Sequence, residues 1–397
     1  MEYKFSDLFK WTSGKPLSPS EGLYPIYGSN GIIGYTNEGK FKNKIILGRV
    51  GAYCGSVNYC KTFFNATDNT LVTTCNEEKI LYPFAYYLLK SYNLNSYSGG
   101  AAQPLITQNV LKHLKCEIPE LKIQKKIASI LSAYDNLIEN NNKRIKLLEE
   151  QAQELYKEWF IRFRFPGHEN IDFKDTPVGK IPLTFNFIAM NEVIEDYIGG
   201  GWGEENYSES FPIEAYVIRG ADFPKVTLFD ISSCPSRFHK INNYNQRQLK
   251  EGEIILEISG GTEEVPVGRT ILVTKDLIDR FENGRVICAS FCKVLRLKKE
   301  IISFIYFYYW MQFLHSSRII DRYQLQSTGI INFKFEYFLK KGFIILPPME
   351  IMKKFDKKIY PLLSQMNKLS LFNSHLAKQR DLLLPRLMSG KLEVKPD

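Results

Sequence analysis

Lysine, arginine and asparagine side chains recur on the turns expected between short strands in two separate regions of the sequence. The set comprises Lys15, Asn30, Lys40, Lys42, Lys44 and Arg49 in the first region and Lys225, Arg237, Lys240, Arg247 and Arg269 in the second. Cationic side chains on turns reach backbone phosphates, and amide or guanidinium groups can pair with base edges. Any one of these residues is more often an ordinary solvated surface residue, so the prediction that they contact DNA concerns the set.

Two patterns that resemble sites for phosphate binding or methyl transfer are incomplete. GGGWG, beginning at Gly199, lacks GK[ST] and does not give GxGxxG between a strand and a helix, so we expect a flexible turn. An enzyme that methylates a flipped base would need Asn or Asp before Pro-Pro-aromatic, but Pro347-Pro348 lies between Leu346 and Met349. The polar atom that would hold the base is missing, so we expect no such chemistry in this chain.

Nuclease and metal sites also lack their residues. Metal-assisted hydrolysis by a nuclease requires clustered carboxylates and a lysine. Asp381, Glu393 and Lys395 superficially resemble such a set, but they lie across a helix end at the extreme end of the sequence. Cys288 and Cys292 lie in VICASFCKVLRL, which we expect to form one strand with both thiols buried on one face. The histidines, without HExxH or HxH spacing, are His113, His168, His239, His315 and His375. We therefore expect no catalytic residue and no metal site.

Composition indicates a globular protein with an anionic partner. The chain has 397 residues, 44% of them hydrophobic and 24% charged, which is enough to bury the cores of two or three domains. Its formal net charge of +9 favours an anionic partner, although many unrelated proteins are as basic. The sequence shows neither an apolar run long enough to span a membrane nor a secretion signal, and its 7 cysteines suit free thiols. We expect a cytoplasmic protein.

A repeat predicts two long helices that pack on each other. IPELKIQKKIASIL, from Ile118, and LPPMEIMKKFDKKI, from Leu346, superpose with a shift of 228 residues that continues downstream without a gap. Apolar residues recur every seventh position, which predicts helices of roughly 35 to 42 residues, about 50 to 60 Å long. The expected helix-packing residues are Ile127, Tyr134, Leu148, Leu155, Phe355, Leu362, Leu369, Leu376 and Leu383.

Polar and proline residues should modify these helices. Asn141 interrupts the apolar series, either as a polar residue that fixes the register of a helix pair or as a solvated kink, and the sequence favours neither. Pro361 should bend the second helix, and Pro385 should end its regular part.

The unlike stretches before each helix are rich in strand patterns. In both, strands precede an aromatic helix, a small-residue loop (SGGAAQP at Ser98, QSTG at Gln326), a short helix and one more strand. The expected fold class is α+β, with two globular strand-rich domains separated by two long antiparallel, coiled-coil-like helices in a pseudo-two-fold tandem repeat. The expected boundaries are 1–117 for the first domain, 118–165 for the first helical segment, 166–345 for a linker and the second domain, and 346–397 for the second helical segment.

In this order of segments and in its motifs, the sequence resembles the specificity subunits of Type I restriction-modification enzymes. The motifs are GRVGAYCGSV, FNATDNTLV, SGGAAQPLI and LLEEQAQELYKEWF in the first half, and VIRGADF, LPPMEIMKKF and LLLPRLMSGKLEV in the second. The resemblance implies that the two strand-rich domains are target recognition domains, each contacting one half of a split, asymmetric DNA site. The helices would set the spacing between the half-sites.

The resemblance also implies which functions belong to partner proteins. Two methyltransferase subunits would dock on the helical region, and restriction or motor subunits would join them. The assembly would act on double-stranded DNA and would not associate with a membrane. S-adenosylmethionine, ATP and Mg would bind those partners, and this chain would hold no cofactor and catalyse nothing. The alternatives are a stand-alone nucleic-acid-modifying enzyme, which the missing motifs oppose, and a coiled-coil adaptor that does not bind DNA.

Overall fold

The computed structural model describes residues 2–99, 104–262, 265–327 and 330–395, so the expected loops SGGAAQP and QSTG lie partly outside the described residues. The chain divides into two compact units. Unit 1 comprises Met1–Glu139 with Ser374–Asp397, and unit 2 comprises Asn140–Asn373. The described helices include none that is both long and apolar enough to cross a membrane.

Unit 1 is built on a six-stranded sheet with the strand order β2-β7-β5-β6-β3-β4. Only β3 and β6 pair in parallel within this sheet as described; the other neighbours are antiparallel. The strands are β2 (Phe9–Ser13), β3 (Tyr24–Gly28), β4 (Gly31–Thr36), β5 (Phe41–Gly48), β6 (Val57–Ala66) and β7 (Thr70–Cys75). β-branched and aromatic residues make up half of β5 to β7, as is typical of strands packed against a core.

Among the described residues, three α-helices and a two-stranded sheet accompany this six-stranded sheet. These are β1 (Glu2–Lys4) paired with β8 (Lys115–Glu117), α1 (Phe5–Leu8), α2 (Tyr82–Ser91) and α3 (Gln108–His113). α2 carries proline in its first turn, where the missing N–H costs no hydrogen bond. The Thr107 hydroxyl caps α3 by accepting a hydrogen bond from the Val110 N–H. The aromatic helix expected before the SGGAAQP loop is confirmed as α2.

Unit 2 contains a four-stranded sheet, β12-β19-β15-β17, and a three-stranded sheet, β16-β21-β20. Their strands are β12 (Ile194–Gly199), β15 (Ile254–Glu257), β16 (Ser259–Gly261), β17 (Thr270–Leu272), β19 (Cys292–Leu297), β20 (Gln324–Ser327) and β21 (Ile330–Phe333). The helices around them are α5 (Met190–Val193), α6 (Phe223–Val226), α8 (Lys275–Ile278), α9 (Phe304–Ser316) and α10 (Phe335–Lys341). Two strand pairs frame them: β9 (Phe173–Thr176) with β10 (Gly179–Pro182), and β11 (Asn186–Ala189) with β22 (Phe343–Leu346).

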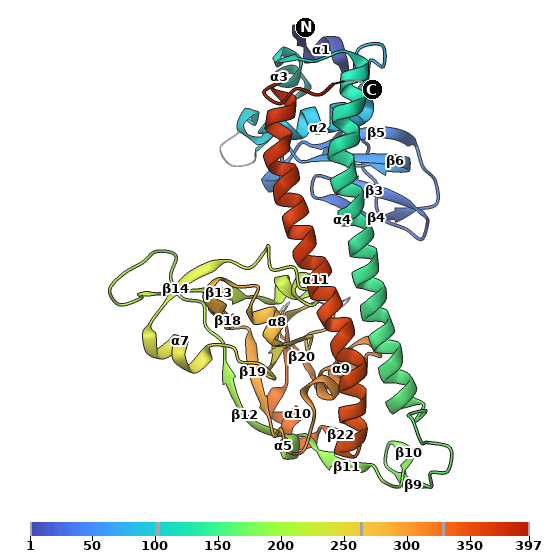
Figure 1. Cartoon of the computed structure of the whole chain (residues 1–397), viewed down its shortest axis with the longest axis vertical. Coiled ribbons are helices and arrows are strands. Elements are labelled where there is room, and N and C mark those ends of the chain that lie inside the picture. The colour runs from blue at the N-terminus through green and yellow to red at the C-terminus, as the bar shows by residue number, and fades with distance from the viewer. Residues whose placement is uncertain (1, 100–103, 263–264, 328–329, 396–397) are drawn as a thin grey trace. The chain divides into compact units, whose positions relative to one another are not determined.

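A further small layer in unit 2 has its own core. Its sheet has the order β14-β13-β18, with β13 (Ile213–Ile218), β14 (Ser236–His239) and β18 (Val286–Cys288), and α7 (Ile241–Arg247) packs on it. Buried residues from β13, α7 and β18 form a separate apolar cluster. Figure 1 shows α7 on the side of unit 2 away from α11 (Met349–Met388).

The two units follow the same order of elements at their edges. A short strand, a one-turn helix and a sheet strand begin each unit's domain, as β1-α1-β2 and as β11-α5-β12. An aromatic helix, a short helix, a strand and a long helix end it, as α2-α3-β8-α4 and as α9-α10-β22-α11, where α4 is Leu121–Tyr156. The expected tandem repeat and the α+β class are therefore confirmed.

The long helices are α4, with 36 residues, and α11, with 40 (Figure 1). In unit 2 they run antiparallel, because Asn141 bonds to Asn373 while Tyr156, later in α4, packs on Phe355, earlier in α11. In unit 1, the Asp135 carboxylate of α4 pairs with the Arg380 guanidinium of α11. The boundary between the units falls inside both helices.

Burial along the helices is greatest beside the expected heptad series. Ile127, Phe355 and Leu376 of that series are buried, whereas Tyr134, Leu148, Leu155, Leu362, Leu369 and Leu383 are half-buried. Leu131, Ile145, Ala152, Ile359, Met366 and Leu387 next to them are all buried. The centre of the packed face thus lies between the expected series and these neighbouring residues, since in each unit the helix segments also pack on the strand-rich domain of that unit.

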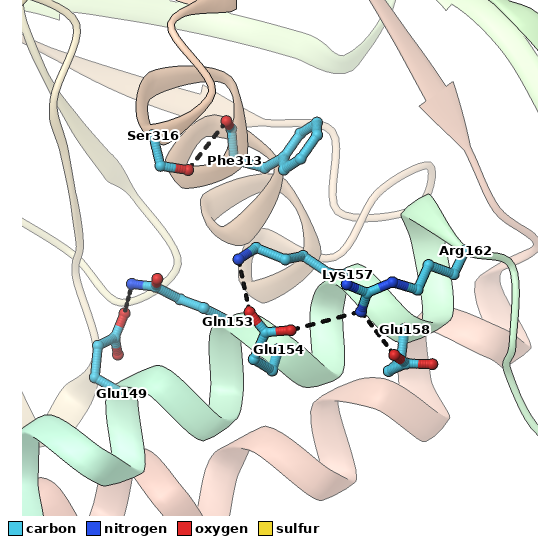
Figure 2. Close-up of polar contacts among 8 residues, drawn as sticks. All are labelled: Glu149, Gln153, Glu154, Lys157, Glu158, Arg162, Phe313 and Ser316. Atoms are coloured by element: carbon cyan, nitrogen blue, oxygen red, sulfur yellow. Dashed lines mark hydrogen bonds and ion pairs between the residues drawn. The ribbon is translucent and has the colours of Figure 1, made fainter.

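Ion pairs and hydrogen bonds, one of them to a buried carboxylate, join side chains near the end of α4 (Figure 2). Gln153 donates a hydrogen bond of 2.9 Å to Glu149, which also accepts one of 3.2 Å from the Tyr309 hydroxyl. Burial raises the pKa of the Glu149 carboxyl. Further along the chain, Glu158 lies within a π-helical turn at Lys157–Ile161 and pairs at 2.6 Å with Arg162, which directly follows this turn.

Two expectations about these elements are wrong. VICASFCKVLRL forms two strands rather than one, because β18 pairs in parallel with β13 while β19 pairs with β12 and β15 in another sheet. α11 does not end at Pro385 but continues to Met388. The helix also continues through Pro361, whose side chain is exposed, and the expected bend at this residue stays a prediction.

Candidate nucleic-acid interface

Loops at one end of the unit 1 sheet are joined by hydrogen bonds around Arg49. The Arg49 N–H donates to the Asn69 carbonyl at 3.0 Å, and the Ser29 hydroxyl donates to the same carbonyl at 2.7 Å. The Arg49 guanidinium reaches the Ser13 hydroxyl at 3.4 Å. These loops carry three residues of the expected contact set, Lys15, Asn30 and Arg49, of which Lys15 and Asn30 are exposed.

The other three residues of the expected set in unit 1 are Lys40, Lys42 and Lys44, which lie at or just before the start of β5 against aromatic rings. The Lys42 ammonium lies 4.9 Å from the Phe63 ring centre, and the Lys44 ammonium lies 4.9 Å from that of Tyr82. Lys40 and Lys42 are exposed, while Lys44 is half-buried and bonded to the Tyr82 hydroxyl. The six residues therefore form two groups on this unit rather than one patch.

In unit 2, Lys240 and Arg247 lie at the two ends of α7 and line one open cleft. Lys240 is exposed, with its ammonium 5.2 Å from the Phe211 ring centre. Arg247 is half-buried and donates from Nε to the Gly199 carbonyl at 2.9 Å. The Arg247 side chain thus ties the end of α7 to the GGGWG turn.

The GGGWG turn approaches neighbouring backbone closely. A Cβ on Gly200 would lie 2.2 Å from the Ala289 carbonyl oxygen, and Gly203 has a φ of +75°. Only glycine fits such positions without strain. Trp202, between them, stacks on Arg237 at 4.5 Å, and Arg237 pairs with Glu205 at 2.8 Å. Arg237 therefore has an internal partner, although it lies on the same small layer.

Arg269 and Lys225 differ in whether their side chains are free to contact DNA. Arg269 donates two hydrogen bonds to the buried Glu257 carboxylate, at 2.8 and 2.6 Å, and one to the Gly220 carbonyl at 2.9 Å. These contacts raise the pKa of the guanidinium and fix it inside the unit. We therefore leave Arg269 out of the contact set proposed below. Lys225, on α6, is exposed.

Sequence reasoning missed polar residues on α7. Asn242, Asn245 and Gln246 are all exposed on this helix, between Lys240 and Arg247. Amides are common on turns, so the pattern INNYNQR did not distinguish them before the helix was known. The signal that could have found them is their i, i+4 spacing, which places Asn242 and Gln246 on one face.

Nothing in the described part of the chain brings three His, Cys, Asp or Glu side chains close enough to hold a metal ion. The seven cysteines are buried free thiols. Burial raises the pKa of the Cys75 thiol to about 12 and that of the Cys288 thiol to about 12 as well. Such thiols remain protonated at neutral pH and are poor nucleophiles.

Comparison with known proteins gives a consistent set of relatives. A family model described as the Type I restriction modification DNA specificity domain matches residues 1–150. The Type I restriction enzyme MjaIX specificity subunit of Methanocaldococcus jannaschii is 26% identical, over 80% of this chain and 71% of that protein. The MjaVIII specificity subunit of the same organism is 24% identical, over 99% of this chain and 92% of its own length.

A solved structure shares the fold. The crystal structure of a Type I restriction-modification S subunit from M. genitalium superposes with a TM-score of 0.53, covering 100% of this chain and 96% of that chain. The identity is 17%, so this likeness concerns the fold alone.

Proposed function

The chain belongs to the specificity subunits of Type I restriction-modification enzymes, and from this premise we propose that its two units each contact one half of a split DNA site. The observation that carries the proposal is the repeat of element order at the edges of both units, around sheets that differ. The repeated edge elements would thus hold two different recognition surfaces, one in each unit. The small layer of β13, β14, β18 and α7 belongs to unit 2, which supports an asymmetric target.

The proposed contacts to phosphates and bases are those of exposed or half-buried polar side chains. In unit 1 they are Lys15, Asn30, Lys40, Lys42, Lys44 and Arg49, and in unit 2 Lys225, Arg237, Lys240 and Arg247. Neutralising phosphates releases counterions, so DNA binding by the complex should weaken steeply as salt rises. A coiled-coil adaptor without DNA contacts would show no such dependence.

We also propose that α4 and α11 set the spacing between the half-sites and dock two methyltransferase subunits. Exposed apolar residues along both helices support docking: Leu137 and Leu382 in unit 1, and Leu147, Leu371 and Phe372 in unit 2. Large apolar side chains left exposed on a helix often mark an interface. Restriction or motor subunits would join this assembly in the cytoplasm.

In this proposal the chain itself is not catalytic. S-adenosylmethionine, ATP and Mg would bind the partner subunits, which would methylate adenine and cleave DNA. Incubating the purified chain with DNA and labelled S-adenosylmethionine checks this, because methyl transfer without a partner would contradict it.

The decisive experiment exchanges residues 1–117 for the corresponding domain of another specificity subunit. In a host with the complete system, sequencing of methylated DNA should show one altered half-site, with the other half and the spacing unchanged. The reciprocal exchange of residues 186–345 should alter the opposite half. Changes in both halves from either exchange would contradict separate recognition by the two units.

A further inference from the structure

The solvent face of α7 carries side chains suited to contact with bases. Tyr244 points into the small core of unit 2, with Val217 and Ile287. The opposite face exposes Ile241, Asn242, Asn245 and Gln246. Positions four residues apart in a helix lie above one another, so these four side chains form two adjacent columns on one surface.

The backbone of this helix is anchored while its amide side chains are available. Arg296 donates to the Gln246 carbonyl at 3.1 Å and is itself held by Glu253 at 2.9 Å. The next residue, Arg247, donates a hydrogen bond from its side-chain Nε to the Gly199 carbonyl. The amide side chains of Asn242 and Gln246 make no hydrogen bond to residues that the structure describes. Contacts from a rigid helix need little ordering on binding.

Charge around this face favours an anionic partner. α7 contains no carboxylate and Lys240 precedes it. Of the residues that line the described cleft, Lys240 and Arg247 are cationic and Glu209 is a carboxylate. Glu205, nearby in sequence, pairs with Arg237 at 2.8 Å, and its neighbour Glu204 is exposed.

We propose that α7 enters the major groove and recognises A·T base pairs in the half-site of unit 2, an inference that rests on the proposed function. Asparagine and glutamine amides pair with N6 and N7 of adenine, and an apolar side chain such as that of Ile241 contacts the thymine methyl group. An α-helix with its side chains is about 10 to 12 Å across, which fits a major groove about 12 Å wide. Arg247 acts as a positioning residue for this helix.

The first test uses the unaltered complex. Exchange of residues 1–117 identifies the half-site of unit 2 as the half that does not change. This half should contain at least one A·T pair besides that of the methylated adenine. A half-site composed otherwise of G·C pairs would overturn the assignment of α7, while leaving recognition of separate half-sites by the two units intact.

The second test replaces Asn242 and Gln246 by alanine, singly, in the full chain assembled with its methyltransferase subunits. Methylation of oligonucleotides with each base at each position should show discrimination falling roughly tenfold to a hundredfold at one or two positions of that half-site. The other half should not change. If both variants still methylated DNA and discriminated between bases as well as the unaltered chain at every position, the proposal would be overturned.

Gln246→Glu keeps the size of the side chain and guards against loss of folding. A carboxylate accepts but cannot donate, so preference at the affected position should shift from adenine toward cytosine. The control is Asn186→Ala, an exposed amide of unit 2 outside α7, which should leave the target unchanged. If Gln246→Glu instead abolished binding of a partner protein without altering base preference, α7 would be a protein-docking surface and the proposal would be wrong.

Discussion

At the scale of single residues, Asp356 in α11 links the stability of unit 2 to pH. Its carboxylate accepts a hydrogen bond of 2.7 Å from Ser303, and burial raises its pKa from 3.8 to about 6. The folded chain therefore favours the protonated carboxyl. Its stabilising contribution is present below the ordinary pKa and is lost as pH rises toward about 6.

We expect Asp356→Asn to remove this pH dependence. Asparagine keeps an oxygen that can accept the Ser303 hydrogen bond but does not ionise. The free energy of unfolding of the variant, relative to that of the unaltered chain, should rise by on the order of 2 kcal/mol between pH 4 and pH 7. Urea unfolding at several pH values measures it. Asp172→Asn, at an exposed position, is the control, and parallel curves for Asp356→Asn would refute the linkage.

At the scale of elements, the antiparallel pairing of α4 and α11 contains a polar contact. Asn141 is buried and donates to the Asn373 carbonyl oxygen of the side chain at 2.8 Å, and Asn373 donates to Asn142 at 2.8 Å. This favours the interpretation of Asn141 as a register-fixing residue over that of a solvated kink. A buried amide is satisfied only when the two helices meet at the correct positions.

Removal of either amide should therefore cost stability in a coupled way. We expect Asn141→Ala to lower the free energy of unfolding by about 1 to 2 kcal/mol, because a buried polar partner loses its bond. In a double-mutant cycle with Asn373→Ala, the two effects should be non-additive by about 1 kcal/mol. Gln151→Ala, exposed on α4, serves as the control. Additive losses would show that the amides do not act as a pair.

The elements that the sequence predicted well are those that depend on local pattern. The seven-residue period predicted α4 and α11 because each turn of a helix bonds to the turn before it. β18 and β19 were merged because their separation depends on β13, about 70 residues upstream in the chain. Arg269 was assigned to the surface because nothing near it in the sequence indicates the buried Glu257.

At the scale of the whole molecule, the proposed role of the helices can be tested by shortening both of them together. Residues 136–142 of α4 and 372–378 of α11 lie where the two units divide, and most of them are exposed. Deleting seven residues from each preserves the heptad phase on both sides of the cut. It also removes Asn141 and Asn373 as a pair, so neither amide loses its partner alone.

Removing seven helical residues shortens each helix by about 10 Å, the rise of about three base pairs. We expect the methylated target to keep both half-sites while the spacing between them falls by about three base pairs, because the proposed base contacts lie on the domains and not on the helices. Sequencing of methylated DNA from a host carrying the complete system measures both properties. Deleting residues 136–142 alone is the matched comparison: it shifts α4 against α11 and should abolish activity. If the paired deletion left the original spacing in place, the helices would not determine it.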